Sequence, residues 1–205
     1  MQVIEAIDTY YKRNNANVHR GIHELSEVAT AAFEGARSYI AKSVNAKNPE
    51  ELVFVRGCTE AINLVAQAFL KPRLNPGDEI IVTILEHHAN IVPWQMVAQE
   101  KGAKIRVVMV DEAGSIDIDS YENMLSSKTK MVAFSHISNV LGTVLPVKRM
   151  VKKAHAYGVP VLVDGAQSTP HMSIDVSDIG ADFYTFSSHK AFGPTGIGCL
   201  LYTSP

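Results

Sequence analysis

Residues 185–196 read Thr185-Phe186-Ser187-Ser188-His189-Lys190-Ala191-Phe192-Gly193-Pro194-Thr195-Gly196 and connect two apolar runs, residues 183–186 and 197–202. The first run is typical of a buried strand, and it changes abruptly into small, polar and basic residues. Lys190 therefore follows a buried strand and is flanked by hydroxyls and an imidazole. A lysine at such a place either extends its amine into solvent or has a partner or a chemical task. Taken alone, the first interpretation is favoured, so the rest of the sequence has to decide.

Length and composition indicate an ordinary globular protein. The chain has 205 residues, of which 46% are hydrophobic and 20% charged, and its formal net charge is −2. Such a chain can form one large domain or two small ones, and its charge gives no reason to expect nucleic acid or a membrane as a partner. No apolar run approaches the roughly 18 residues that a membrane helix needs. Cys58 and Cys199 are too few for a disulfide framework, which favours reduced thiols in a cytoplasmic setting.

The hydrophobic pattern predicts an α/β fold in which short apolar strands alternate with helices. Strands are expected at residues 52–55, 79–83, 104–108, 130–134, 159–163, 183–186 and 198–201. Helices are expected at residues 3–11, 26–44, 59–70, 90–101, 117–125 and 147–157. Because strands this apolar are buried on both faces, we expect a mostly parallel seven-stranded sheet with helices on both faces. In such sheets the ligand site lies beyond the carboxyl ends of the strands.

Polar groups follow five of the predicted strands at those carboxyl ends. They are Arg56-Gly57-Cys58-Thr59-Glu60, Glu86-His87-His88-Ala89-Asn90, Ser135-His136-Ile137-Ser138-Asn139, Asp164-Gly165-Ala166-Gln167 and the stretch that contains Lys190. Because the carboxyl ends of parallel strands meet at one edge of a sheet, these groups could converge on one cavity. This convergence is the strongest functional signal in the sequence.

Each group also has an ordinary structural interpretation. The turn at residues 57–59 can bind an anion through free N–H groups, but Thr59 can equally be a helix N-cap. Asp164, taken alone, is more often a turn cap, and Asn139 and Gln167 would each be turn residues. The neighbouring histidines that follow the second strand point in different directions. No further ligand has metal spacing, so we expect no metal site.

Together the groups fit one ligand, pyridoxal 5'-phosphate. This cofactor needs a lysine amine to form a Schiff base, a carboxylate on its pyridine nitrogen, hydrogen-bond donors for its phosphate and a stacking partner for its ring. The candidates for these four tasks are, in order, Lys190, Asp164, the turn at 57–59 with Ser187 and His189, and His87. The sequence contains no Walker loop or glycine-rich dinucleotide fingerprint.

The chain resembles the class V aminotransferase group of fold-type I pyridoxal phosphate enzymes. The resemblance rests on Asp164-Gly165-Ala166-Gln167, Ser187-Ser188-His189-Lys190 and Gly193-Pro194-Thr195-Gly196. Three more stretches are similar to SufS/CsdA-type (group II) cysteine desulfurases and selenocysteine lyases. They are His19-Arg20-Gly21-Ile22-His23-Glu24-Leu25-Ser26, Glu86-His87-His88-Ala89-Asn90-Ile91-Val92-Pro93-Trp94 and Ser135-His136-Ile137-Ser138-Asn139-Val140-Leu141-Gly142. The resemblance extends over essentially the whole chain.

The resemblance implies catalytic roles for Lys190, Asp164 and His87. Lys190 would bind the cofactor covalently and shuttle protons, Asp164 would pair with the pyridine nitrogen, and His87 would stack on the ring. The implied cofactor-binding residues are Cys58, Thr59, His87, Asn139, Asp164, Gln167, Ser187, His189 and Lys190.

Two further points concern the substrate and the phosphate. The resemblance implies that Asn139 binds the substrate. It implies the same for His19 and Arg20, which would lie near the entrance or a dimer contact. Relatives often carry threonine at the position of Cys58. The cysteine therefore removes a good hydroxyl donor for the phosphate, although the backbone N–H remains.

The implied activity is that of a cysteine desulfurase, which converts L-cysteine to L-alanine and an enzyme-bound persulfide for iron–sulfur cluster assembly. A cytoplasmic homodimer and a sulfur-acceptor protein are implied as well. Residues 1–205 would be the cofactor-binding large domain, with N-terminal helices and an active-site loop in 1–50 and the sheet core in 51–205. The persulfide cysteine and a substrate-binding arginine would belong to a smaller C-terminal domain. We therefore expect the chain to be truncated at both ends and inactive alone.

Other functions remain open. A selenocysteine lyase, or another lyase or transaminase of the same family, would share these cofactor motifs, because substrate choice lies largely in the missing half. From a different class, the chain could be a non-catalytic α/β protein that binds a phosphate ligand. An interaction protein on a retired enzyme scaffold is disfavoured, because the lysine, the aspartate and the histidine occur together.

Overall fold

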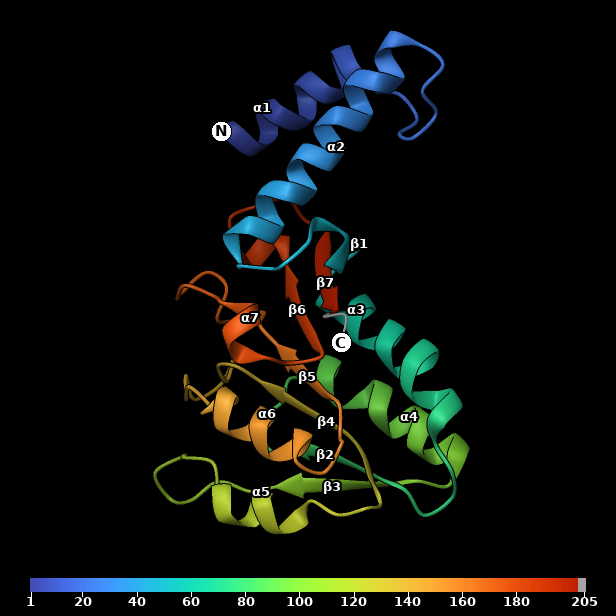
Figure 1. The fold of residues 1–205 in the computed structure, drawn as a ribbon. Helices are drawn as coiled ribbons and strands as arrows, with labels where there is room; N and C mark the ends of the chain where they lie inside the picture. The colour runs from blue at the N-terminus through green and yellow to red at the C-terminus, as the bar shows by residue number, and fades with distance from the viewer. Residues whose placement is uncertain (203–205) are drawn as a thin grey trace.

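Seven strands form a single sheet in the computed structural model, which describes residues 1–202 (Figure 1). They are β1 (Leu52–Val55), β2 (Glu79–Thr83), β3 (Lys104–Val108), β4 (Thr129–Ser135), β5 (Val161–Asp164), β6 (Phe183–Ser187) and β7 (Gly198–Tyr202), in the order β1-β7-β6-β5-β4-β2-β3. All neighbours are parallel except those of β7, which runs antiparallel to β1 and β6. The predicted mostly parallel sheet is confirmed. Residues 203–205 of the predicted domain lie outside the described residues.

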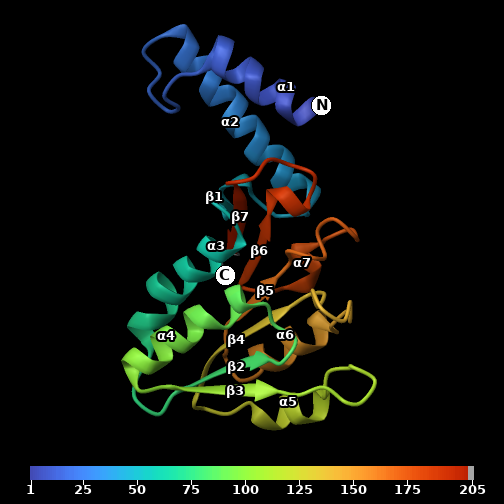
Figure 2. The ribbon, with the colours of Figure 1, turned by 180° about the vertical axis from the view of Figure 1, so that it is seen from behind.

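Helices cover both faces of the sheet (Figures 1 and 2). The α-helices are α1 (Gln2–Thr9), α2 (Glu24–Ser43), α3 (Cys58–Leu64), α4 (Val92–Lys101), α5 (Ile118–Met124), α6 (Val147–His155) and α7 (Val176–Ile179). Short π and 3-10 segments are η1 (Tyr10–Asn14), η2 (Pro49–Glu51), η3 (Val65–Leu70), η4 (Lys71–Arg73), η5 (His88–Asn90) and η6 (Ser188–Lys190). Because successive strand side chains point to opposite faces, Ile80 of β2 belongs to the core with Trp94 of α4, whereas Ile81 belongs to the core with Tyr121 of α5. The sheet is thus buried between two helical layers.

The observed elements differ from the predicted ones mainly at their ends. The strand predicted at 159–163 is β5, and the helix predicted at 59–70 is α3 followed by the π-helical η3. The pattern does not predict α7, because four residues are too few to show a helical periodicity. The expectation that every strand is buried on both faces is wrong for β3. It is an edge strand whose residues Lys104 and Arg106 are exposed.

The N-terminal helices extend away from the sheet (Figures 1 and 2). Both helices predicted in this region are present, and the C-terminal end of α2 is anchored in the core by Ala41. In contrast, α1 buries none of its residues, and the apolar side chains of Ile4, Ile7 and Tyr11 are exposed. No helix within residues 1–202 is long and apolar enough to cross a membrane.

Candidate active site

The carboxyl ends of β4, β5 and β6 meet the N-terminus of α3 around one cavity of about 220 Å³. It is lined by Cys58, Thr59, His87, Ala89, Ser135, Ile137, Asn139, Asp164, Ala166, Gln167, Ser187, His189 and Lys190. Every residue predicted to bind the cofactor therefore lines the same cavity. The fold explains this convergence, because parallel strands bring their carboxyl ends to one edge of the sheet. Cofactor binding itself stays a prediction.

Asp164 presents one carboxylate oxygen to the cavity. It is the last residue of β5, lies beside Thr185 of β6 in the sheet and is 6% exposed. Its Oδ1 accepts hydrogen bonds from the backbone N–H of Ala166, at 2.9 Å, and from the thiol of Cys58, at 3.2 Å. Within residues 1–202, no hydrogen bond reaches Oδ2, and no buried side-chain polar atom lacks a partner. Oδ2 is therefore accessible from the cavity and can accept a proton donor from a ligand.

Gly165 allows the chain to turn immediately after Asp164. A Cβ atom at this position would lie 2.2 Å from Cε1 of Tyr184, a contact that real Cβ atoms do not make. The Tyr184 ring cannot easily yield, because it is 2% exposed and its hydroxyl is hydrogen-bonded to His136 Nδ1, at 3.0 Å, and to Ser168 Oγ, at 2.7 Å. The close packing of the Tyr184 ring against the turn after Asp164 thus depends on a glycine at position 165.

We expect Gly165→Ala to destabilise the protein by roughly 1–3 kcal/mol, the usual cost of overpacking a core. The measurement is the free energy of unfolding from urea denaturation. Gly35→Ala is the matched control, because Gly35 lies in α2 and a methyl group there would meet nothing within 4 Å. That exchange should be neutral or stabilise the helix by up to about 1 kcal/mol. Equal effects of the two substitutions would contradict the proposed contact with Tyr184.

The N-terminus of α3 is held against the end of β6. The backbone N–H of Cys58 donates to Ser187 Oγ at 2.8 Å. The two segments approach closely because Gly198 of β7 has no side chain, and a Cβ atom there would lie 2.6 Å from Gly57 Cα. The backbone N–H of Cys58, expected as a donor for a phosphate, is thus engaged by Ser187 in this structure, and its contact with a phosphate stays a prediction. The hydrogen of the Ser187 hydroxyl is still available to a ligand, because its oxygen accepts in this bond.

Thr59 and His189 form the exposed part of this wall. Neither side chain makes a hydrogen bond to another residue in the described part of the chain. With Cys58 and Ser187 they also line a second hollow of about 670 Å³ beside the cavity. A hydroxyl, an imidazole and a helix N-terminus facing the same space are suitable for an anion.

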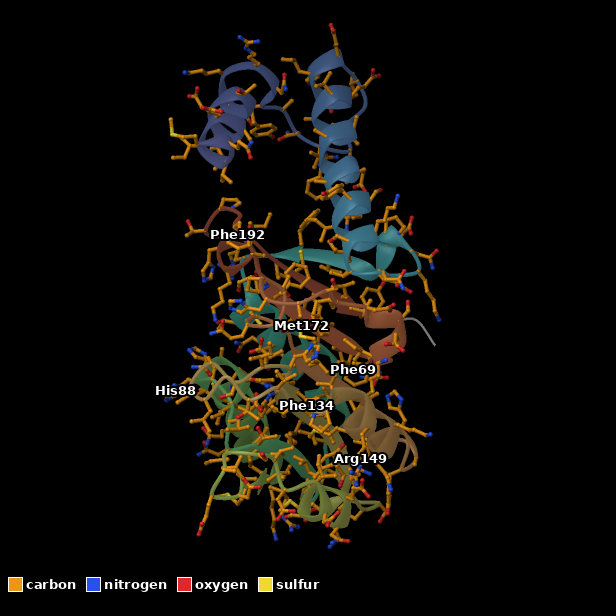
Figure 3. The ribbon with its side chains drawn as sticks, turned by 90° about the vertical axis from the view of Figure 1, so that its left-hand side faces the viewer. Phe69, His88, Phe134, Arg149, Met172 and Phe192 are labelled. Carbon is orange, nitrogen blue, oxygen red and sulfur yellow. The ribbon has the colours of Figure 1, made fainter. Side chains whose placement is uncertain are left out.

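Lys190 lies in η6 and is half-buried, with its side chain on the cavity. Within residues 1–202 its amine forms no ion pair or hydrogen bond. Two residues farther on, Phe192 has a positive φ of 63° and is 83% exposed. Figure 3 shows Phe192 on the side of the sheet domain nearer the N-terminal helices. The lysine is thus presented at the cavity on a short loop, without a partner from the protein.

His87 follows β2 and caps η5. Its Nδ1 accepts the backbone N–H of Ala89 at 3.1 Å. Because a backbone N–H can only donate, the neutral ring carries its proton on Nε2. The exposed ring lines the cavity and meets the His88 ring edge to face, with 6.0 Å between the ring centroids. His87 can therefore lie against a flat ligand, whereas His88 lies at the protein surface (Figure 3).

Asn139 and Gln167 line the cavity from the segments after β4 and β5. Neither side chain is hydrogen-bonded to another described residue, so both amides are free for a ligand. His19 and Arg20 do not line this cavity. The ring of His19 is paired with Glu34 of α2 at 2.8 Å, on the N-terminal helices. The geometry of one chain therefore does not support substrate contacts for His19 and Arg20.

Glu86 is a buried residue to which the sequence pattern assigned no role. Its carboxylate accepts hydrogen bonds from the hydroxyls of Thr83 and Ser135, the backbone N–H of Ser135 and the amide of Asn90. It therefore joins β2 and η5, which flank His87 in the chain, to the more distant strand β4. Burial raises the pKa of Glu86 to about 7, although the four hydrogen bonds act in the opposite direction. A carboxylate directly before a histidine pair was a possible signal, but one partner, Ser135, lies 49 residues away in the sequence.

We expect stability to fall as pH rises through the range in which Glu86 ionises. Its pKa is about 7 in the folded protein against an ordinary value of 4.5, so folding takes up a proton between these values. The contribution is fully present below pH 4.5 and is lost as pH rises to about 7. The change is roughly 3 kcal/mol at about 1.4 kcal/mol per pKa unit. Unfolding free energies of the wild type and Glu86→Gln should differ in this slope, and identical slopes would contradict the prediction.

The comparisons with known proteins agree on one family. The family model described as Aminotransferase class-V matches residues 1–204. A probable cysteine desulfurase of Halalkalibacterium halodurans is 52% identical over 198 residues, which are 97% of this chain and 49% of that protein. The crystal structure of the cysteine desulfurase CsdA from Escherichia coli matches with a TM-score of 0.90 at 42% identity and covers 98% of this chain and 50% of that chain. A structure of SspA in complex with cysteine has a TM-score of 0.90 at 29% identity and covers 98% of this chain and 57% of that one.

The chain spans about half the length of these relatives. Within that half, the similarity includes the N-terminal helices as well as the sheet. The predicted resemblance to class V aminotransferases and to cysteine desulfurases is confirmed.

Proposed function

Because this chain belongs to the class V aminotransferase family, we propose that residues 1–205 form the cofactor-binding domain of a pyridoxal phosphate-dependent cysteine desulfurase. Residues 1–50 would contribute the N-terminal helices and an active-site loop, and residues 51–205 the sheet core. One observation carries the proposal: the amine of Lys190 and Oδ2 of Asp164, both without a protein partner, line the same cavity. An electrophilic carbonyl and a protonated ring nitrogen are the groups that such an amine and carboxylate would bind.

Each remaining part of the cofactor also has a suitable group in the cavity. The flat ring would lie against His87. Its phenolic oxygen would lie near the free side-chain amides of Asn139 and Gln167, which could donate hydrogen bonds to it. The phosphate would lie at the N-terminus of α3, where Thr59, Ser187 and His189 supply donors. Because these donors come from α3 and β6, one phosphate would bind two elements that are far apart in the sequence.

When bound, pyridoxal phosphate supplies an electron-withdrawing ring that makes the Cα proton of an amino acid more acidic. Oδ2 of Asp164 would accept the hydrogen bond of the ring nitrogen and keep the proton there. Lys190 would be the residue that holds the cofactor covalently. Its amine, when free, would be the base that removes the Cα proton and the acid that returns a proton to the product. The hydrogen bonds of Cys58 and Ala166 to Oδ1 hold the carboxylate in place during these steps.

We propose that L-cysteine is the substrate and that L-alanine and an enzyme-bound persulfide are the products. The C–S bond of the substrate breaks, and an S–S bond forms on an accepting cysteine thiolate. Neither cysteine of this chain is suited to that task. Burial raises the pKa of the Cys58 thiol well above its ordinary value and that of Cys199 to about 12. The accepting cysteine, and an arginine for the substrate carboxylate, would then belong to a smaller domain in the other half of a longer protein.

The exposed apolar side chains of the N-terminal helices support a homodimer. Ile4 is 68% exposed, Tyr11 68%, Ile22 89% and Tyr39 77%. So many large apolar side chains on the N-terminal helices and the loop between them are unusual for a surface that faces only water. His19 and Arg20 lie in the same region, so a dimer contact suits them better than the cavity of their own chain. We further propose a cytoplasmic enzyme that passes sulfur to an acceptor protein for iron–sulfur cluster assembly.

A selenocysteine lyase, or another lyase or transaminase of the family, is the alternative within the same chemistry. The test is an assay of the protein expressed from its complete gene, loaded with pyridoxal phosphate and given L-cysteine, with a thiol as the final sulfur acceptor. We expect alanine and sulfide in equal amounts. A preference for L-selenocysteine, or the formation of pyruvate or an oxo acid, would favour the alternatives. A protein that stays colourless with pyridoxal phosphate would instead be a non-catalytic binder of phosphate ligands.

A further inference from the structure

The thiol of Cys58 lies against the carboxylate of Asp164. Cys58 is the first residue of α3 and is 6% exposed. Its Sγ is 3.2 Å from Asp164 Oδ1 and 2.8 Å from Thr185 Oγ1. Asp164 and Thr185 are partners in the parallel pairing of β5 and β6, so one side chain contacts both strands. The contact joins residues 106 positions apart in the sequence.

The directions of these hydrogen bonds follow from the proton count. A thiol has one hydrogen, and a carboxylate can only accept, so the thiol hydrogen goes to Asp164 Oδ1. The hydroxyl of Thr185 must then donate to Sγ. The backbone N–H of Cys58 is engaged separately, by Ser187 Oγ. The thiol and the backbone N–H of Cys58 thus both make hydrogen bonds to residues in the wall of the cavity.

The thiol keeps its proton at neutral pH. Burial raises the pKa of Cys58 well above its ordinary value, and the negative charge of Asp164 raises it further. The hydrogen bond with Thr185 and the positive charge of Lys190 act in the opposite direction but do not reverse the shift. The protonated thiol is therefore a stable hydrogen-bond donor and a poor nucleophile.

We propose that Cys58 is a positioning residue that orients the Asp164 carboxylate, holding Oδ1 so that Oδ2 faces the cavity. This inference rests on the proposed function and deepens it. The Cys58 thiol and the backbone N–H of Ala166 both donate to Oδ1 of Asp164. This leaves Oδ2 as the carboxylate oxygen that can accept a ligand's protonated nitrogen. The thiol acts only as a hydrogen-bond donor, and it carries no sulfur from the substrate.

The first experiment measures the dissociation constant of pyridoxal phosphate by absorbance titration of the protein from its complete gene. Cys58→Ala removes one donor to a charged group, so we expect binding to weaken roughly tenfold. Cys58→Ser supplies a hydroxyl donor at the same position and should restore most of the affinity. Cys199→Ala is the matched control, because Cys199 is also buried but lies in β7 away from the cavity. It should leave the dissociation constant unchanged, even where it lowers the melting temperature.

The second experiment needs no cofactor. Iodoacetamide alkylation of Cys58, followed by mass spectrometry of its peptide, reports how much thiolate is present. Asp164→Asn removes the negative charge that raises the pKa of the thiol, so Cys58 should react several-fold faster at pH 8 while Cys199 reacts as before.

The two experiments distinguish a failure of the positioning role from a failure of the proposed function. Unchanged affinity in Cys58→Ala, or a serine variant no better than the alanine variant, would overturn the positioning role. Unchanged alkylation in Asp164→Asn would overturn the contact itself. A wild-type protein that does not bind pyridoxal phosphate would contradict the proposed function instead, and the alkylation result would still test the pairing of Cys58 with Asp164.

Discussion

Replacing Lys190 with alanine is expected to abolish the covalent attachment of pyridoxal phosphate and all turnover of L-cysteine. Its amine is the one that lines the cavity beside the free oxygen of Asp164. Without it, no other lysine within residues 1–202 lines the cavity to take over. The measurement is borohydride reduction of the loaded protein, followed by mass spectrometry. In the wild type, the added mass should be found on the peptide that contains Lys190, and the visible absorbance band of the Schiff base should be lost because its C=N bond is reduced to a stable amine.

Two further variants make this result specific. Lys152→Ala changes an exposed lysine of α6 and should leave the labelled peptide and the activity as they are in the wild type. Lys190→Arg keeps the positive charge but cannot form the covalent bond, so it should behave like the alanine variant. Labelling of another peptide in Lys190→Ala, or activity in either Lys190 variant, would show that the lysine has been misassigned.

The second large effect is expected for Asp164→Asn. This exchange keeps the size of the side chain but removes the negative charge that would hold a proton on the ring nitrogen. Breaking a buried charge-assisted pair typically costs about 3 kcal/mol or more, which corresponds to roughly a 100-fold loss of activity. The measurement is the rate of alanine formation at saturating cysteine, with the absorbance spectrum of the bound cofactor as the second readout. We expect the covalent attachment at Lys190 to survive, because that bond forms at another part of the cavity.

Asp182→Asn is the control for a general effect of losing a carboxylate. Asp182 accepts the backbone N–H of Val161 at 2.7 Å and is paired with His155 at 2.9 Å, at the opposite end of β5 and β6. Its substitution should lower stability without changing the cofactor spectrum. If Asp164→Asn has wild-type activity, the carboxylate is not the partner of the ring nitrogen.

Much of the fold could be predicted because hydrophobic periodicity is a local property. The bounds of β1, β2 and β3 follow directly from their apolar runs, and the alternation of strands with helices implies a parallel sheet. The exposure of β3 could not be predicted, because an edge position is a matter of strand order and not of local composition. The short helix α7 could not be predicted either, because its four residues are too few to show a helical periodicity.

The same distinction applies to the candidate site. Which residues line the cavity could be predicted, because each one stands directly after a strand, and the carboxyl ends of parallel strands meet. Where their side chains point could not. The Cys58 thiol was expected beside a phosphate and lies against Asp164, and Glu86 joins Thr83, Asn90 and Ser135 behind His87.

The amino-acid sequence alone therefore determines the sheet, the lysine at the end of β6 and the set of polar groups that share its cavity. The direction of Cys58, the free oxygen of Asp164 and the exposed surface of the N-terminal helices are decided only in the folded chain. The physical reason is distance along the sequence. The hydrogen bonds of Cys58 join residues 106 and 129 positions apart, and they depend on the register of β5 with β6 and on the close approach that Gly198 permits.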